Sequence, residues 1–321
     1  MNTKTRLLII NYHYVLPNGR STFSGLQGVR VDDFAQHLIN LKDKFNSPRT
    51  VMLPLTQENA ESDLNFLITF DDGIQEISDH VLPLLKKNKL TAIIFCCSQP
   101  YLENRVLNVQ KTHLLQGRWG WQRFQNKFEA ALDTIKQPWN YEDQSCLGLS
   151  RMYRYDNPET SRFKRKLNVE IPYPVVDKVL DLLFEAEFGA QEPIAKKLYL
   201  STDAIRRCVD SGITIGVHTH SHCMLSRLNV EEQRKELSLC ISYFQDHLGI
   251  EITTISYPYG ILGSWNEQTK KLVKASGLSA GLTLGRQIYN PREHMDPFEI
   301  PRYDVNDIFT PDGKVRDGTI I

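Results

Sequence analysis

The sequence lacks a long apolar run, a net charge and a regular spacing of cysteines. The apolar run near its amino terminus, at residues 7–10, is too short for a signal peptide, and no stretch approaches the length of a membrane span. We therefore expect a cytoplasmic protein with no transmembrane segment. Lys and Arg together number 38, as do Asp and Glu, so no overall field favours nucleic acid or an anionic membrane as a partner.

The cysteines exclude a second class of protein. Six are present and no two have Cys-x-x-Cys spacing, which favours reduced thiols over a disulfide framework. At 321 residues the chain can form one α/β barrel without dividing into two domains. We expect one catalytic domain with an insertion, and nothing in the sequence defines its oligomeric state.

Short β-type runs recur along the chain, and helical patterns separate most of them. The runs lie at residues 7–11, 66–70, 92–97, 214–217, 253–256, 280–283 and 298–301. One of the intervening helical stripes consists of Phe34, Leu38, Leu41 and Phe45, at the spacing of a buried helix face. The alternation predicts βαβ units, in which outer helices cover parallel strands.

Polar side chains follow directly after these runs. They are His13, Asp71, Asp72, His218, His222, Tyr259 and Arg302. In a barrel of parallel strands the carboxyl ends of the strands carry the chemistry, so we expect these side chains to share one rim. Two carboxylates at the end of one strand can divide two tasks, since one can hold a metal while the other moves protons. His218 and His222 are four residues apart and can meet one ion.

Three motifs carry a resemblance to a known family. They are Thr69-Phe70-Asp71-Asp72-Gly73, His218-Thr219-x-x-His222 and Tyr257-Pro258-Tyr259-Gly260. In this order and separation they resemble the motifs of the polysaccharide deacetylases of the NodB-homology type, also called carbohydrate esterase family four. The resemblance covers about residues 7–100 and 201–304 and leaves the middle of the chain outside it.

The resemblance implies a fold and a set of roles. The fold is an irregular (β/α)7 barrel, formed by residues 1–100 and 201–321, with residues 101–200 as a helical insertion that caps it. Asp72, His218 and His222 would hold a divalent metal, with zinc preferred from the ligand types. Asp71 would be the general base, and the backbone N–H of Tyr259 would donate to the oxyanion. Each motif also has a structural explanation. His218 and His222 can cap a loop, Asp71 can form a turn with Gly73, and Tyr259 can lie in a plain turn at a strand end.

The sequence departs from the family pattern at two positions. Ser256 stands where the family has an arginine that partners the base, and we hypothesise that Arg302 substitutes for it. The carboxy-terminal Leu-x-His motif is absent. Asn11-Tyr12-His13-Tyr14 resembles the members in which an amino-terminal histidine protonates the leaving amine, so His13 is the candidate acid. A satisfied histidine at a strand end is the alternative for His13.

The predicted insertion offers weaker signals. Trp119, Trp121 and Phe124 can stack on a sugar, although buried packing is the more common use of such aromatics. The basic residues at 162 and 164–166 can hold a phosphate of a carrier or form a solvated helix face. His220 is expected to point away from the metal, and Cys223 to be a small buried thiol.

We therefore expect a metal-dependent carbohydrate N-deacetylase, an amide hydrolase that releases acetate from an N-acetylated amino sugar. The sugar is expected to be an intracellular precursor, whether nucleotide-linked, lipid-linked or oligomeric. A non-haem iron oxygenase uses a similar ligand set but a barrel of antiparallel strands, which disfavours it. The other alternative is a non-catalytic carbohydrate-binding protein that has kept the fold and lost turnover.

Overall fold

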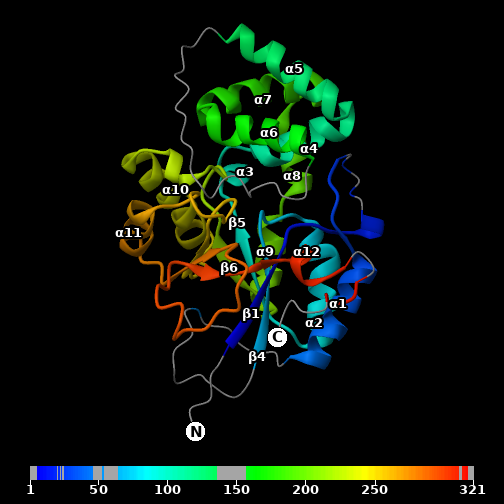
Figure 1. Ribbon diagram of the computed structural model, residues 1–321, viewed down its shortest axis with the longest axis vertical. Helices are drawn as coiled ribbons and strands as arrows, with labels where there is room; N and C mark the ends of the chain where they lie inside the picture. Colours follow the sequence, from blue (N-terminus) through cyan, green and yellow to red (C-terminus); the bar gives the residue numbers. More distant parts are fainter. Residues whose placement is uncertain are drawn as a thin grey trace.

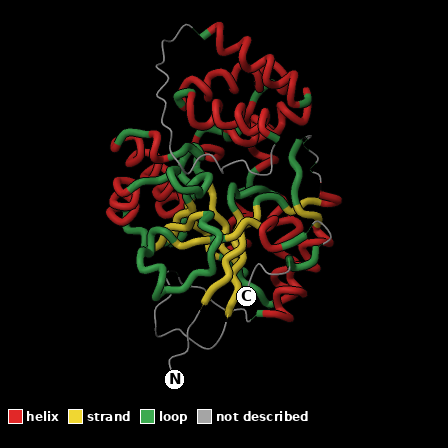
Figure 2. The backbone as a smooth tube through the Cα atoms, viewed as in Figure 1, coloured by secondary structure: helices red, strands yellow, loops and turns green. Residues whose placement is uncertain are grey.

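A closed sheet of parallel strands occupies the centre of the molecule (Figures 1 and 2). The computed structural model describes residues 6–19, 21, 23, 25–45, 53, 64–135, 157–310 and 313–316. In spatial order the strands are β10 (Tyr303–Asp304), β1 (Arg6–Tyr12), β4 (Leu64–Phe70), β5 (Ala92–Cys96), β6 (Thr214–Val217), β7 (Thr254–Ser256), β8 (Ala280–Thr283) and β9 (Ile300–Pro301). A separate parallel pair joins β2 (Val15–Leu16) to β3 (Val29–Arg30).

The last strand closes the barrel because it is divided between two partners. Ile300 of β9 pairs with Leu282 of β8, whereas Tyr303 of β10 pairs with Ile10 of β1, and Arg302 lies between the two halves. The chain segment 300–304 thereby joins both edges of the sheet. The predicted irregular barrel of seven strands is confirmed, and its parallel pairings exclude the antiparallel barrel of the oxygenase alternative.

Helices surround the barrel and connect its strands. They are α1 (Val31–Lys44), α2 (Leu82–Asn88), α9 (Thr202–Asp210), α10 (Val230–Ser242), α11 (Glu267–Ala275) and α12 (Val305–Ile308), with π-helical turns at Ile77–Val81 and Tyr243–His247 and 3₁₀ turns at Pro17–Gly19 and Leu225–Arg227. Among the residues described, none of the helices combines the length and apolar character that a transmembrane helix requires.

Successive residues along the barrel strands point alternately into two hydrophobic cores, one between the strands and the outer helices and one inside the barrel. In β1, Leu8 and Ile10 pack under the outer helices, whereas Leu7 and Ile9 fill the barrel interior. In β4, Phe66 and Ile68 face outward and Leu67 faces inward. This follows from the two-residue period of a strand. The inward rows therefore continue to polar residues at the strand ends, where the site begins.

A layer of helices lies over one end of the barrel, at the top of Figure 1. It comprises α3 (Gln99–Leu102), α4 (Asn108–Trp119), α5 (Trp121–Thr134), α6 (Pro158–Arg165), a π-helical turn at Lys166–Glu170, α7 (Tyr173–Phe188) and α8 (Gln191–Leu198). Its apolar side chains form a separate core that includes Phe124, Phe128, Leu180 and Phe184. The segment between β5 and β6 is thus a second packed layer, and the exact domain bounds at 100 and 201 stay a prediction.

The cysteines of the described chain form no disulfide. Cys96, Cys97, Cys208, Cys223 and Cys240 are all buried free thiols. The sixth, at position 146, lies outside the described residues. Cys223 is the buried thiol that the sequence suggested, and burial raises its pKa.

Candidate active site

Two adjacent carboxylates separate at the end of β4 because the backbone turns between them. Asp71 continues the inward row of Leu67 and Thr69, whereas Asp72 takes a left-handed conformation with φ of 71°. Gly73 follows at φ 64°, and a Cβ there would lie 2.7 Å from the sulfur of Cys96. Only glycine fits this turn, which is why the two carboxylates point in different directions.

Both oxygens of the Asp71 carboxylate accept hydrogen bonds. Arg302 donates from Nη1 to Oδ1 and from Nη2 to Oδ2, both at 2.9 Å, and Asn11 donates to Oδ2 at 3.0 Å. Burial alone would raise the pKa of Asp71, but the charge and hydrogen bonds of Arg302, together with the nearby histidines, hold this pKa well below the usual range. Asp71 is therefore kept ionised.

Arg302 lies inside the barrel and is completely buried. Beyond Asp71 it donates to Asn11 Oδ1 at 2.8 Å, Thr69 Oγ1 at 3.1 Å and Ser256 Oγ at 2.7 Å. These partners belong to β1, β4 and β7, so one guanidinium ties together three strands at the rim. Arg302 thus occupies the space next to Ser256, the position at which the sequence lacks an arginine.

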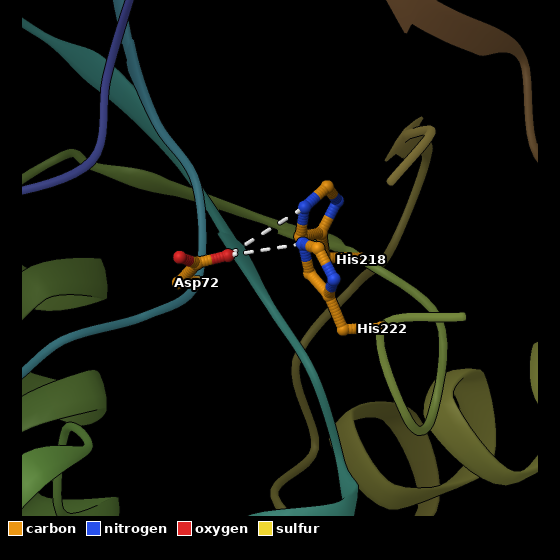
Figure 3. Close-up of side chains that lie close together, drawn as sticks. All are labelled: Asp72, His218 and His222. Carbon is orange, nitrogen blue, oxygen red and sulfur yellow. Dashed lines mark ion pairs between the residues drawn. The ribbon is translucent and has the colours of Figure 1, made fainter. Parts of the chain in front are cut away.

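Asp72, His218 and His222 form a compact cluster (Figure 3). Their candidate ligand atoms all lie within 4.8 Å of one another. Asp72 Oδ1 is 3.7 Å from Nε2 of His218 and 3.4 Å from Nε2 of His222. The carbonyl of Ser256 lies 2.7 Å from His218 Nδ1, and because a carbonyl only accepts, this contact places the hydrogen on Nδ1 and leaves Nε2 as an acceptor.

The cluster has the electrostatic character of a cation site. Asp72 Oδ1 is buried and accepts no hydrogen bond from the residues that the structure describes. Burial lowers the pKa of His218 and of His222 to about 4, so both rings are neutral and present lone pairs at physiological pH. One carboxylate and two neutral imidazoles are a donor set that suits zinc and related divalent metals. The residues present therefore fit a metal ion.

The remaining predicted residues line the cavity above this cluster. A cavity of about 790 Å³ is bordered by His13, Asp71, Asp72, His218, His222 and Tyr259, among others. Tyr259 has a φ of 66°, and its hydroxyl donates to Oδ1 of Asn168 at 3.1 Å. Arg302 does not border the cavity, because Asp71 and the strand ends cover it. The structure thus brings six of the seven predicted residues to one cavity and places Arg302 beneath it.

His220 and the tryptophans of the insertion, which the sequence also singled out, lie away from the cavity. His220 bonds Ser98 Oγ at 2.8 Å and Glu103 Oε1 at 3.0 Å, so its ring points away from the metal cluster. Trp121 packs in the insertion core against Phe163, and Trp119 Nε1 donates to a glutamate there. Neither tryptophan borders the cavity, whereas Lys164 of the basic stretch does.

Sequence reasoning missed the residues that the insertion sends to this site. Gln110 donates to Asp72 Oδ2 at 2.8 Å, and His113 and Asn168 line the cavity. No motif or spacing marks them, because they come from helices whose placement over the barrel depends on tertiary packing. Asn11 could have been predicted from the sequence, because the two-residue period of β1 places it on the same inward face as Leu7 and Ile9, two residues before the candidate His13.

Comparison with known proteins identifies the family. A family model described as polysaccharide deacetylase matches residues 59–126 and 170–281, more than half of the chain. The match runs into the middle of the chain, beyond the region that the motifs covered. The Bacillus subtilis protein YxkH, whose name assigns it to the polysaccharide deacetylases, is 28% identical over 116 residues. That similarity spans 36% of this chain and 40% of YxkH, less than half of either protein.

Solved structures of similar fold cover nearly the whole chain. The Streptococcus pyogenes deacetylase PplD, in complex with acetate, has a TM-score of 0.56 at 15% identity and covers 98% of this chain and 97% of its own. IcaB from Ammonifex degensii has a TM-score of 0.52 at 18% identity, with coverage of 97% and 95%. At such identities the likeness concerns the fold. It includes the helical insertion, and it confirms the family's barrel as the architecture of this chain.

Proposed function

The chain belongs to the polysaccharide deacetylase family, whose activity is carbohydrate deacetylation, and from this premise we propose that it is a metal-dependent hydrolase acting on an N-acetylated amino sugar. Water adds to the amide carbonyl carbon, the C–N bond breaks, and acetate and the free amine leave. The observation that carries the proposal is the Asp72, His218 and His222 cluster, which shares one cavity with Asp71 and His13.

Asp72, His218 and His222 would hold the metal. A divalent cation bound there supplies Lewis acidity, which lowers the pKa of a water and polarises a carbonyl. The zinc preference rests on ligand type, since two imidazoles and a carboxylate are common zinc donors. The carbonyl of Ser256 supports this role, because it fixes the tautomer of His218 with Nε2 directed to the cluster.

Asp71 would take the proton from the attacking water. Its ionised state is favoured by Arg302, which engages both carboxylate oxygens. Arg302 is buried beneath the cavity, so its role would be to orient and charge-balance the base and not to touch the substrate. Replacement of Arg302 by methionine without loss of turnover would exclude this role.

His13 and Tyr259 would act on the other reacting atoms. His13 borders the cavity together with both carboxylates, a position from which its ring would donate a proton to the leaving nitrogen. Tyr259 would donate its backbone N–H to the developing oxyanion. Tyr259 has a left-handed backbone conformation in the turn that follows β7.

Acetate release from a panel of N-acetylated amino sugars, free and nucleotide-linked, tests the proposal. The metal-loaded wild type should release acetate, a chelator should abolish release, and Asp71→Asn should remove it without loss of metal. Asp246→Asn, which changes an exposed carboxylate in the segment Tyr243–His247, is the matched control and should keep full activity. No release from any sugar by a wild type that still binds sugar would favour the non-catalytic carbohydrate-binding alternative.

A further inference from the structure

One residue of the insertion reaches the candidate metal ligand directly. Gln110, in the first turn of α4, is completely buried, and its Nε2 donates to Oδ2 of Asp72 at 2.8 Å. The other oxygen of the same carboxylate, Oδ1, faces the two histidines and accepts no hydrogen bond within the described chain. The two oxygens of Asp72 therefore have different surroundings, because Gln110 donates a hydrogen bond to Oδ2 and not to Oδ1.

The orientation of the Gln110 amide is itself fixed. Its Oε1 accepts from the hydroxyl of Tyr199 at 3.0 Å, and that hydroxyl accepts from the backbone N–H of Leu107 at 2.9 Å. Its Nε2 also donates to the hydroxyl of Tyr14 at 3.0 Å. A flipped amide would set its oxygen against the carboxylate of Asp72, so only one orientation satisfies every partner.

We propose that Gln110 is a positioning residue for the metal site: by holding Oδ2 of Asp72, it reserves Oδ1 for the cation. The proposal rests on the proposed metal dependence, and it makes the insertion part of the site's construction. A carboxylate without this donor can turn about its terminal bond and exchange its two oxygens. Hydrogen-bond partners of metal ligands commonly change metal affinity by about 10- to 100-fold when they are lost.

The test compares metal binding among full-length variants that differ in one buried group. Gln110→Met keeps the length of the side chain and removes the amide. Gln191→Met is the matched control, because Gln191 is a buried amide of the same layer that donates to Asp181 at 2.9 Å and makes no contact with Asp72. Tyr199→Phe removes only the hydroxyl that orients Gln110. Zinc affinity is measured by competition with a chromophoric chelator, and site geometry by the visible absorption of the cobalt-loaded protein.

We expect Gln110→Met to bind zinc about 10- to 100-fold more weakly than the wild type and to show an altered cobalt spectrum. Tyr199→Phe should shift both in the same direction by a smaller amount, and Gln191→Met should match the wild type. Equal affinity and equal spectra for Gln110→Met and Gln191→Met would overturn the proposal, and if Gln110→Met fails to fold, wild-type values for Tyr199→Phe would do so. A wild type that binds neither metal would instead refute the proposed metal dependence itself.

Discussion

The barrel rim and the helical insertion each place a carboxylate beside a glutamine, buried at the rim and half-buried in the insertion, and the two carboxylates have opposite surroundings. In the insertion, Asp181 accepts from Gln191 and also contacts the cations Lys111 and Arg105. At the rim, Asp72 accepts from Gln110 through one oxygen, while its other oxygen faces only two histidines. The insertion pairs its carboxylate with cations of its own, one of them the buried Lys111, whereas the rim leaves one acceptor of Asp72 open toward a cavity.

This difference between Asp181 and Asp72 distinguishes a charge that stabilises the fold from one that serves a binding site. Burial of an uncompensated carboxylate is costly, so a fold retains one only where something supplies the missing positive charge. In the insertion, Lys111 of α4 and Arg105 of the preceding segment supply it, and both pair with carboxylates of α7. At the rim the donor set points to a cation from solution. Loss of a cation that pairs a buried or half-buried carboxylate should therefore change stability, and substitution of Asp72 should change metal binding.

The largest expected effect comes from Arg302→Met, which would leave Asp71 buried without its cation. Breaking a buried pair in this way costs about 3–5 kcal/mol, and we expect a loss of that size in the free energy of unfolding from urea titration. The folded pKa of Asp71 lies below its unfolded value, so the pair contributes fully above about pH 4 and its contribution is lost as the pH falls lower. The gap between wild type and variant should shrink in acid.

A double variant separates charge from packing. Arg302→Met with Asp71→Asn has no buried charge left to compensate, so it should be more stable than Arg302→Met alone. Equal stability of the two would mean that the loss comes from the strand contacts through Thr69 and Ser256 and not from the ion pair.

Asp72→Asn should have the next largest effect, on metal binding and not on the fold. Loss of a direct ligand should weaken zinc binding by more than the roughly 100-fold upper range for indirect partners, which is about 3 kcal/mol. Stability of the metal-free protein should be unchanged or raised, because Oδ1 of this buried carboxylate accepts no hydrogen bond from the described residues. Calorimetric zinc titration measures the loss of affinity, and thermal unfolding in the presence of a chelator measures the stability of the metal-free protein. A marked drop in metal-free stability would mean that Asp72 stabilises the fold as the insertion carboxylates do.

Much of the rim could be predicted because strand ends are local features. The runs at 7–11 and 66–70 correspond to β1 and β4, and the two-residue period places Asn11, Thr69 and Asp71 on one inward face. The helical stripe through Phe34, Leu38 and Leu41 corresponds to the buried face of α1. Such periodicity is set by local geometry and needs no knowledge of the partner surface.

The contacts between the layers could not be predicted in the same way. The last strand was expected as one run at 298–301, but Arg302 divides it so that its halves pair with opposite edges of the sheet. Gln110 and Asn168 reach the site from helices that are placed by tertiary packing, and no short pattern in the sequence marks either. The proposed roles of the rim residues rest on the three motifs, which are short and local and therefore readable from the sequence.

Lys111→Met tests whether the ion pairs of the insertion affect stability without affecting the metal site. Lys111 is completely buried next to Gln110 in the sequence, but it contacts Asp181 and Asp177. Arg105 continues to pair both carboxylates, so the expected loss is about 2 kcal/mol, below the range for an unpaired buried charge. Zinc affinity should equal that of the wild type. A Lys111→Met variant that loses metal affinity as Gln110→Met does would mean that the whole of α4 matters and not one amide.

Tyr259→Phe tests the contact at which the two layers meet, and it should have the smallest effect. The Tyr259 hydroxyl donates to Asn168 across the edge of the cavity, and one such hydrogen bond contributes about 1 kcal/mol to stability. The proposed oxyanion donor is the backbone N–H, which this substitution leaves in place, so kcat should be kept while KM rises modestly. Asn168→Ala should reproduce the change in KM, and the double variant should add nothing further, because both remove the same bond. A large fall in kcat for Tyr259→Phe would show that the hydroxyl acts on the reacting atoms, and that the insertion shares in the chemistry through Asn168.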